Sequence, residues 1–347
     1  MKDIQIGKHT IGDNHKPFVI AEMSGNHNGD LNRALEIVDA AAASGAHAIK
    51  LQTYTADTMT MKGALTITDP NSLWHGRELY ELYQEAYTPW DWHAPIFKRA
   101  KEKGMEVFSS PFDETAVDFL MDLDVPVIKV ASFENTDIPL LRKVAKTGKP
   151  VIMSTGAASL ADLETGVRTL REAGCKDLIL LKCTSTYPAT PENTNILTIP
   201  HMRELFGVHV GLSDHTMGVG VSIASVALGA RVIEKHFTLR RADGGVDSAF
   251  SIEPYELKSL VEESERAFLS LGKVTYGVSK VEEKSLLFKR SLFAAADIKK
   301  GEALTAKNVR VVRPGTGLKP KYFDVALTKK ANADIKQGTP LSWDLIG

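Results

Sequence analysis

Short apolar runs rich in β-branched residues alternate with longer stretches of helical periodicity, and this alternation repeats eight times before residue 240. Such alternation is typical of a parallel sheet covered by helices. Strands buried on both faces should be continuously apolar, as these runs are. Eight strand–helix units in about 250 residues predict an α/β fold, a (β/α)₈ barrel of the TIM type. The predicted strands are Phe18–Met23, Ala48–Tyr54, Glu106–Phe112, Val127–Ser132, Pro150–Gly156, Leu178–Cys183, His209–His215 and Arg231–Thr238.

Residues with a strong preference for helix ends accompany several of the intervening helical stretches. Asp113 and Ser159 are placed as N-caps, and Asp162 stands where a capping box would need a carboxylate. Pro254 precedes the last long helix. The clearest predicted helices are Leu31–Ser44, Glu114–Leu123, Ser159–Ala173 and Tyr255–Leu271.

The composition changes after residue 270, where Gly272–Glu283 is polar and has the character of a linker. We therefore expect a barrel domain over residues 1–275, a linker over 276–288 and a small domain over 289–347. The small domain contains strand-like runs at Ser291–Ala295 and Val309–Val312. Because a domain of about 60 residues has only a marginal core, we expect it to depend on a partner.

The charge balance restricts the partners of the chain. Lys and Arg number 42 against 43 Asp and Glu, which argues against nucleic-acid and membrane-surface binding. Cys175 and Cys183 are too few for a disulfide framework, and no signal peptide or bilayer-spanning run is visible. These features predict a cytoplasmic protein.

Active sites of such barrels lie at the carboxyl ends of the strands, and polar residues collect at the ends of these runs. Lys50 and Lys129 lie near two strand ends. Lysine charge combined with hydroxyl donors suits a phosphate together with a carboxylate. The alternatives are salt-bridged barrel lysines and ordinary helix N-caps. The hydroxyls at the same rim are Ser110, Ser132, Ser154 and Ser213.

His215 and His236 end the last two predicted strands, which are neighbours in a barrel. Two imidazoles among oxygen donors favour Mn²⁺ or Mg²⁺ completed by water and substrate, although one of them could be a general acid or a hydrogen-bonded core residue. Glu22 ends the first strand and could be a base or place a water, or it could pair with Lys50 or Lys235. Asp247, in the Gly-rich loop after the last strand, could bind sugar hydroxyls or serve the turn.

Several ordered motifs resemble the sialic acid synthase family over nearly the whole chain, and the tail resembles that family's antifreeze-like (SAF) domain of β-clip type. In the barrel they are Ile20-Ala21-Glu22, Asn26-His27-Asn28-Gly29, Lys50-Leu51-Gln52-Thr53, Phe108-Ser109-Ser110-Pro111-Phe112-Asp113, Lys129-Val130-Ala131-Ser132, Gly211-Leu212-Ser213-Asp214-His215 and Glu234-Lys235-His236-Phe237. In the tail the motif is Arg313-Pro314-Gly315-Thr316-Gly317-Leu318.

Within the family, an aromatic-rich stretch from Leu73-Trp74-His75-Gly76 to Trp92-His93 looks like the pseudaminic acid synthase branch, and so does Lys182-Cys183-Thr184-Ser185. Ser110 stands where the family more often has Thr and keeps the hydroxyl. Tyr80, Tyr83 and Tyr87 recur at helical spacing and could simply pack, or part of the stretch could line the substrate pocket.

The resemblance implies a metal-dependent condensation of phosphoenolpyruvate with a 2,4-diacetamido-2,4,6-trideoxy hexose, giving a nine-carbon nonulosonic acid and phosphate. It implies that Glu22, His215 and His236 are catalytic, and that the two histidines hold Mn²⁺ or Mg²⁺. Phosphoenolpyruvate would be bound by Lys50, Ser110, Lys129, Ser132, Ser154 and Ser213. The sugar would be held by Gln52, Phe112, Ser185, Tyr187, Asp247 and, from the partner chain of a domain-swapped homodimer, Arg313.

Other functions are compatible with parts of the pattern. Within the family, N-acetylneuraminate and legionaminate synthases are the alternatives. Barrels host many chemistries, so a metal aldolase, a sugar epimerase or a 3-deoxy-sugar phosphate synthase is a rival. The alternative without enzymatic activity is a saccharide-binding protein, but such a protein would not need charged residues at its strand ends.

Overall fold

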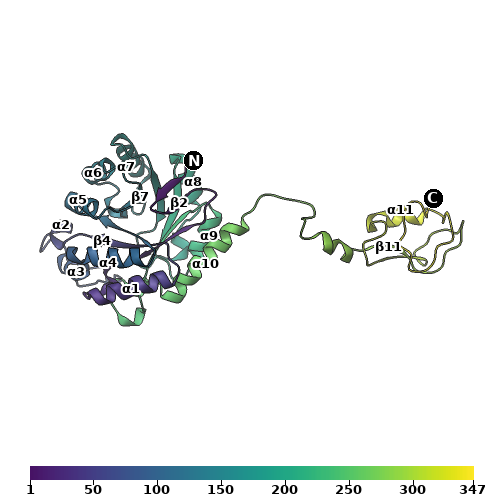
Figure 1. Cartoon of the computed structure of the whole chain (residues 1–347), viewed down its shortest axis with the longest axis horizontal. Helices are drawn as coiled ribbons and strands as arrows, with labels where there is room; N and C mark the ends of the chain where they lie inside the picture. The colour runs from purple at the N-terminus through teal and green to yellow at the C-terminus, as the bar shows by residue number, and fades with distance from the viewer. The chain divides into compact units, whose positions relative to one another are not determined.

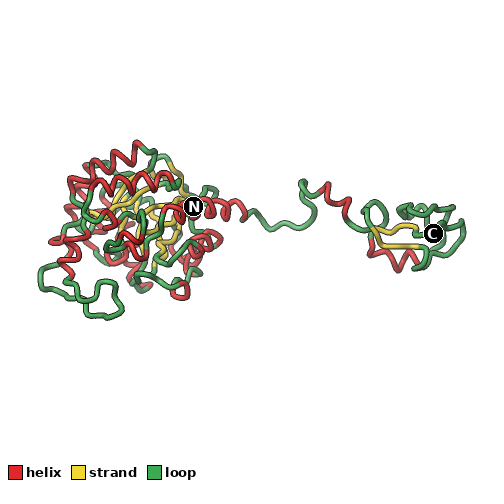
Figure 2. The backbone as a smooth tube through the Cα atoms, turned by 90° about the horizontal axis from the view of Figure 1, so that it is seen from below, coloured by secondary structure: helices red, strands yellow, loops and turns green.

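The computed structural model describes all residues, 1–347, and the chain divides into two compact units, Met1–Gly272 and Lys273–Gly347. Each unit is described by itself. In the first unit the strands lie inside and the helices outside, as Figures 1 and 2 show. No helix combines the length and apolar character needed to cross a membrane.

Eight parallel strands form the wall of a barrel in the order β5-β4-β3-β10-β9-β8-β7-β6, and β5 also contacts β6 to bring the two edges together. The predicted (β/α)₈ barrel is therefore confirmed. Each predicted strand is present, and seven of the eight are shorter than predicted by one to three residues because the ladder ends earlier. The strands are β3 (Phe18–Glu22), β4 (Ala48–Thr53), β5 (Glu106–Pro111), β6 (Ile128–Val130), β7 (Val151–Ser154), β8 (Leu178–Cys183), β9 (His209–Asp214) and β10 (Val232–His236).

Helices follow every strand and bury their apolar faces against the barrel. The Asp113 and Ser159 side chains accept hydrogen bonds from the first turns of α5 and α7, so both predicted N-caps are confirmed, as is the capping box with Asp162. The helices are α1 (Leu31–Ala43), α2 (Ala56–Met59), α3 (Leu79–Ala86), α4 (Trp90–Glu102), α5 (Glu114–Asp122), α6 (Ile138–Lys146), α7 (Leu160–Glu172), α8 (Thr198–Phe206), α9 (Gly220–Ala227) and α10 (Pro254–Ser270).

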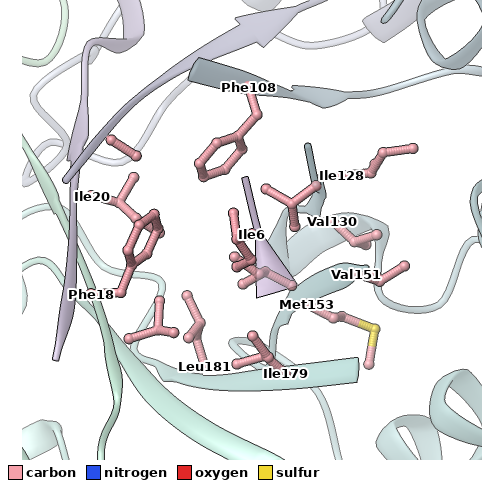
Figure 3. Close-up of a cluster of buried hydrophobic side chains, with 14 of the residues drawn as sticks. Ile6, Phe18, Ile20, Phe108, Ile128, Val130, Val151, Met153, Ile179 and Leu181 are labelled. Atoms are coloured by element: carbon pink, nitrogen blue, oxygen red, sulfur yellow. The ribbon is translucent and has the colours of Figure 1, made fainter. Parts of the chain in front are cut away.

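An antiparallel hairpin precedes the barrel, formed by β1 (Ile4–Ile6) and β2 (His9–Ile11). Ile6 is fully buried, and Figure 3 shows it surrounded by side chains of the barrel strands, among them Phe18, Ile20 and Leu181. The hairpin thus adds to the apolar core that underlies the barrel. No expectation from the sequence covers this hairpin, because strands of three residues carry too little periodicity to be recognised.

The second unit has a small core of its own, built from ten buried apolar residues such as Leu292, Ile335 and Leu341. Strands β11 (Ser291–Ala294) and β12 (Val309–Val312) pair antiparallel at the two strand-like runs predicted there, and a short helix α11 (Phe323–Leu327) packs with them. Residues Glu283–Phe288, in the segment expected to be a linker, form a 3₁₀ helix.

Candidate active site

Four charged side chains face one another near the carboxyl ends of the barrel strands. Glu22 of β3 forms an ion pair with Lys50 of β4. Glu234 Oε1, on β10, lies 3.4 Å from Lys129 Nζ and 3.7 Å from Lys50 Nζ. All four side chains are buried. Glu22, Lys50, Lys129 and Glu234 are called the inner charge cluster below.

Burial and mutual attraction compete within this cluster. Burial raises the pKa of Glu22 to about 7, despite the nearby Lys50 ammonium. Burial also lowers the pKa of Lys129, with Glu234 opposing it. For Glu234, burial disfavours the charge, but Lys129 and Lys50 outweigh burial and hold its pKa below the usual range. Of the two carboxyl groups in the cluster, Glu22 is therefore the better suited to exchange a proton near neutral pH.

Glu234 is absent from the site residues predicted from the sequence, although His236 of the same strand is among them. Side chains alternate across a strand, so an inward His236 requires an inward Glu234 and an outward Lys235. The structure has this alternation, with Glu234 contacting both cluster lysines. A strict period of two applied to this strand would have found the residue.

The four predicted rim serines lie around the cluster. Lys50 Nζ donates a hydrogen bond to Ser110 Oγ at 3.1 Å, and Ser213 Oγ lies 3.5 Å from Glu234 Oε1. Ser132 Oγ accepts from the backbone N–H of Gly156 at 3.2 Å. Ser154 Oγ is buried and has no hydrogen-bond partner. None of the four is the N-cap of a regular α-helix, so the alternative of ordinary helix caps does not hold for them.

The two predicted metal-binding histidines lie side by side, with ring centroids 5.4 Å apart. His215 Nδ1 lies 3.0 Å from the carbonyl oxygen of Thr184, which fixes this nitrogen as the donor and leaves Nε2 free. His236 Nδ1 is buried without a partner. Burial lowers the pKa of His236 well below its ordinary value, and His215 adds to this effect. Its surroundings therefore favour the neutral imidazole.

These features fit a divalent cation. A metal-bound histidine commonly donates its second ring N–H to a carbonyl oxygen, as His215 does here. No third histidine, cysteine or carboxylate joins the pair in a metal-binding group. Water and substrate oxygens would then complete the coordination, which suits Mn²⁺ or Mg²⁺ better than a structural zinc.

The predicted sugar-binding residues that belong to the barrel lie beside the histidines and along the rim. Among them, Phe112 directly follows β5 and packs on Tyr54, with ring centroids 5.3 Å apart. Tyr187 packs on His215 with ring centroids 4.5 Å apart. Asp247 is buried and accepts a hydrogen bond from Ser24 Oγ, so its side chain bonds beyond its own turn. Ser185 Oγ lies 3.6 Å from Cys183 Sγ. Neither Cys183 nor Cys175 forms a disulfide. Gln52 follows Lys50 by two residues on β4 and is half-buried.

Arg313, the remaining predicted sugar-binding residue, lies in the second unit, directly after β12, with an exposed side chain.

Glu134 follows Ser132 in a short 3₁₀ helix, and it is absent from the predicted site residues. Its Oε2 is buried without a partner, and burial raises its pKa to about 7. Its position two residues after a predicted ligand was the only signal in the sequence.

A second buried ion pair lies on the outer face of the barrel wall, on β9 and β10. Lys235 Nζ donates to Asp214 Oδ2 at 2.9 Å and to the carbonyl oxygen of Thr216 at 2.5 Å. Asp214 also accepts from the Thr216 backbone N–H, the Thr216 hydroxyl and the Ser222 hydroxyl, at 2.6–2.9 Å. Lys235, the other partner considered for Glu22, is thus committed elsewhere. Asp214 and Lys235 are called the outer ion pair below.

Comparison with known proteins yields consistent matches for both units. The family model described as "NeuB family" matches residues 37–276, and the SAF domain model matches residues 289–347. A pseudaminic acid synthase from Helicobacter pylori is 44% identical over 95% of this chain and 98% of its own length. An N,N'-diacetyllegionaminic acid synthase from Campylobacter jejuni is 35% identical over 93% of this chain and 98% of its own.

Among solved structures, an N-acetylneuraminic acid (sialic acid) synthetase from Leptospira borgpetersenii, in complex with citrate, superposes with a TM-score of 0.74. It is 33% identical, and the match covers 82% of this chain and 95% of that one. The sequence similarity and the structural similarity therefore point to the same group of proteins.

Proposed function

The chain belongs to the NeuB family, and from this premise we propose that it is a pseudaminic acid synthase-like enzyme. It condenses phosphoenolpyruvate with a 2,4-diacetamido-2,4,6-trideoxy hexose of the 6-deoxy-AltdiNAc type. The products are a nine-carbon nonulosonic acid and phosphate. Two free cysteines support a cytoplasmic location.

The observation that carries the proposal is the inner charge cluster with its hydroxyl rim. Two lysines buried in a barrel are costly unless they serve an anion, and here they lie beside several serine hydroxyls. Phosphoenolpyruvate brings a phosphate and a carboxylate, which need this combination of charge and donors. We assign its binding to Lys50, Lys129, Ser110, Ser132, Ser154 and Ser213.

The condensation joins C3 of phosphoenolpyruvate to the aldehyde carbon of the open-chain sugar. Positive charge develops at C2 as the double-bond electrons form the new carbon–carbon bond, and the aldehyde oxygen takes up a proton from solvent. A water adds to C2, and Glu22, with its pKa of about 7, accepts one proton of that water. The new C2 hydroxyl then loses its proton to solvent as the carbonyl forms, and phosphate leaves with the electron pair of its bond to C2. Lys50 and Lys129 stabilise the phosphate throughout.

We further propose that His215 and His236 hold Mn²⁺ or Mg²⁺. A bound cation would polarise the aldehyde oxygen as a Lewis acid. His215 is oriented for this purpose by the Thr184 carbonyl, and neutral His236 presents a lone pair. Mn²⁺ binding to the wild-type protein and to His236→Ala, measured by calorimetry, tests the assignment. Equal affinities would contradict it.

The sugar is bound, in this proposal, by Gln52, Phe112, Ser185, Tyr187 and Asp247 of one chain and by Arg313 of a partner in a domain-swapped homodimer. Several apolar side chains between the barrel and the SAF domain are exposed, and a second chain would cover them. These side chains are Val274, Tyr276, Val281, Leu287 and Phe288.

Mass measurement in solution tests the dimer, and Arg313→Ala tests the contact. The variant should raise the KM for the sugar by about tenfold or more and leave the KM for phosphoenolpyruvate unchanged. Equal changes in both constants would contradict a role for Arg313 in sugar binding.

The function itself is tested by incubating the enzyme with phosphoenolpyruvate, Mn²⁺ and a panel of acetamido sugars, including the pseudaminic, legionaminic and neuraminic precursors. We expect phosphate release and a product carrying three additional carbons with the 6-deoxy-AltdiNAc sugar. An aldolase or epimerase would release no phosphate, and a 3-deoxy-sugar phosphate synthase would require a phosphorylated sugar. A saccharide-binding protein would bind sugar without binding phosphoenolpyruvate.

A further inference from the structure

The segment between β4 and α4 forms a closed hairpin-like loop over the carboxyl end of the barrel strands. Its two arms pair through the backbone, with Ile67 N–H donating to the Arg77 carbonyl at 2.9 Å and Leu79 N–H to the Leu65 carbonyl at 2.9 Å. The loop continues into α3, whose Tyr80 hydroxyl is held by Asp57 at 3.0 Å. Its position is therefore fixed by contacts at its base.

The tip of this loop contacts the site from one side through Trp74. The indole N–H donates to the carbonyl oxygen of Val246 at 3.1 Å, next to Asp247. The indole ring also lies 6.0 Å from the ring of Tyr187, which packs on His215 and lies 5.3 Å from Phe250. Trp74 thus extends an aromatic surface that begins at the two histidines.

The same segment builds a second aromatic surface on the other flank. Tyr83 of α3 packs edge-on against Tyr54 at the end of β4, with centroids 5.6 Å apart. Tyr54 in turn packs against Phe112 at the end of β5, at 5.3 Å. Strand β3, which carries Glu22, lies between these strands and β10. The segment therefore packs Trp74 and Tyr83 against aromatic rings that follow different barrel strands.

We propose that Trp74 is a specificity-determining residue that selects sugars in which hydroxyl groups are replaced by acetamido and methyl groups. The inference rests on the proposed function and adds the residue that recognises the substituents. Rings of Trp74 and Tyr187 offer apolar contact to the methyl carbons of a second acetamido group and of a 6-deoxy position. A hydroxyl placed against the same rings would lose its hydrogen bonds to water without replacement.

The test compares two sugars with wild-type enzyme and Trp74→Ala in phosphate-release kinetics. One sugar is the 2,4-diacetamido-2,4,6-trideoxy hexose, and the other is N-acetylmannosamine, a hexose with one acetamido group. We expect the ratio of the two kcat/KM values to fall by roughly 10–100-fold in the variant, with the KM for phosphoenolpyruvate unchanged. An unchanged ratio would overturn the proposal.

Two further variants separate the ring surface from the anchoring of the loop. Trp74→Phe keeps an aromatic ring but loses the hydrogen bond to Val246, so it should retain most of the discrimination. Leu73→Ala alters the exposed neighbour on the same loop and should leave the ratio unchanged. A Trp74→Phe variant as impaired as Trp74→Ala would mean that loop anchoring, and not the ring surface, determines the ratio, which overturns the proposal.

Calorimetry with the two sugar alditols, which cannot react, measures recognition without turnover. A loss of affinity in Trp74→Ala that is confined to the diacetamido alditol supports the proposal, whether or not the wild-type enzyme releases phosphate. Absence of phosphate release from the wild-type enzyme would overturn the proposed function alone. Equal losses for both alditols would overturn the role of Trp74.

Discussion

Two buried groups of charges occupy opposite faces of the barrel wall, and they differ in how completely their polar atoms are paired. In the outer ion pair, Asp214 accepts four hydrogen bonds at 2.6–2.9 Å. In the inner charge cluster, the lysine–Glu234 distances are 3.4 Å and 3.7 Å, and Glu234 Oε2 has no partner. Glu234 and Lys235 are consecutive in β10, yet they belong to different groups.

This difference separates a structural ion pair from a binding site. A buried charge is stable only when its hydrogen bonds are satisfied, as they are around Asp214. The side chains of the inner charge cluster are equally costly to bury, but fewer of their hydrogen bonds are formed. Packing and stability therefore do not explain why these charged residues stand inside the barrel. Partly unpaired charges and the unpartnered hydroxyl of Ser154 indicate that a polar ligand completes the group.

The largest expected effect is the loss of activity when the inner charge cluster loses a lysine. Lys129→Met should lower kcat/KM for phosphoenolpyruvate by about 1,000-fold, because the phosphate loses a buried counter-charge. Stability should change less, because Lys50 still attracts Glu234. Phosphate-release kinetics and urea unfolding measure the two effects. An active but unstable Lys129→Met would make the inner charge cluster structural.

The reverse pattern is expected for the outer ion pair. Lys235→Met should lower the free energy of unfolding by roughly 3–5 kcal/mol, because Asp214 would be left buried without its counter-charge. Activity of the folded enzyme should fall by less than about tenfold, since Lys235 faces away from the substrate. Urea unfolding and kinetics at low temperature measure both quantities.

A paired variant serves as the control for Lys235→Met. Asp214→Asn/Lys235→Met removes both charges and keeps an acceptor for the Thr216 and Ser222 donors, so it should regain most of the lost stability. If the double variant remained as unstable as Lys235→Met, the loss would come from packing of the lysine chain and not from an unpaired carboxylate.

A matched pair of serine variants gives a smaller contrast of the same kind. Ser222→Ala removes a donor to Asp214 and should cost about 2 kcal/mol of unfolding free energy without changing the KM values. Ser154→Ala removes a hydroxyl that has no partner, so stability should stay within about 0.5 kcal/mol while the KM for phosphoenolpyruvate rises about tenfold. Exchanged outcomes would contradict the division into structural and binding groups.

The barrel could be predicted from the sequence because its strands are buried on both faces and its helices have clear caps. The Asp113 cap and the β8 boundaries Leu178–Cys183 follow directly from local residue preferences. The N-terminal hairpin could not be predicted, since Ile6 becomes buried only through contacts with distant strands. Tertiary contacts of this kind leave no periodic pattern in the sequence.

The candidate site was predictable to the extent that strand ends are predictable. Lys50, Lys129 and the two histidines stand at such ends and lie together in the structure. What the sequence left open was pairing: Glu22 could have met Lys50 or Lys235, and only the register of the strands decides between them. Glu134 depends on a loop conformation and could not be inferred from the pattern of strands.

The smallest expected effect concerns pH, where the two groups of charges should act in opposite directions. Burial raises the pKa of Glu22 to about 7 from an unfolded value of 4.5, so folding takes up a proton between these pH values. This contribution to stability is complete below pH 4.5 and is lost as pH rises through 7. Burial opposes ionisation of Asp214, but Lys235 and the hydroxyl donors outweigh it and lower its pKa. Its contribution is lost only in acid.

Glu22→Gln isolates the inner carboxyl group because the amide oxygen can still accept from Lys50 while the side chain no longer titrates. In substrate-free and metal-free protein, the wild-type free energy of unfolding should fall by about 1 kcal/mol more than that of Glu22→Gln between pH 6 and pH 8. Urea unfolding at several pH values measures the difference. Parallel curves for the two proteins would mean that Glu22 stays ionised, held by Lys50 as firmly as Asp214 is held by Lys235, and the contrast between the two faces of the barrel would fail at this residue.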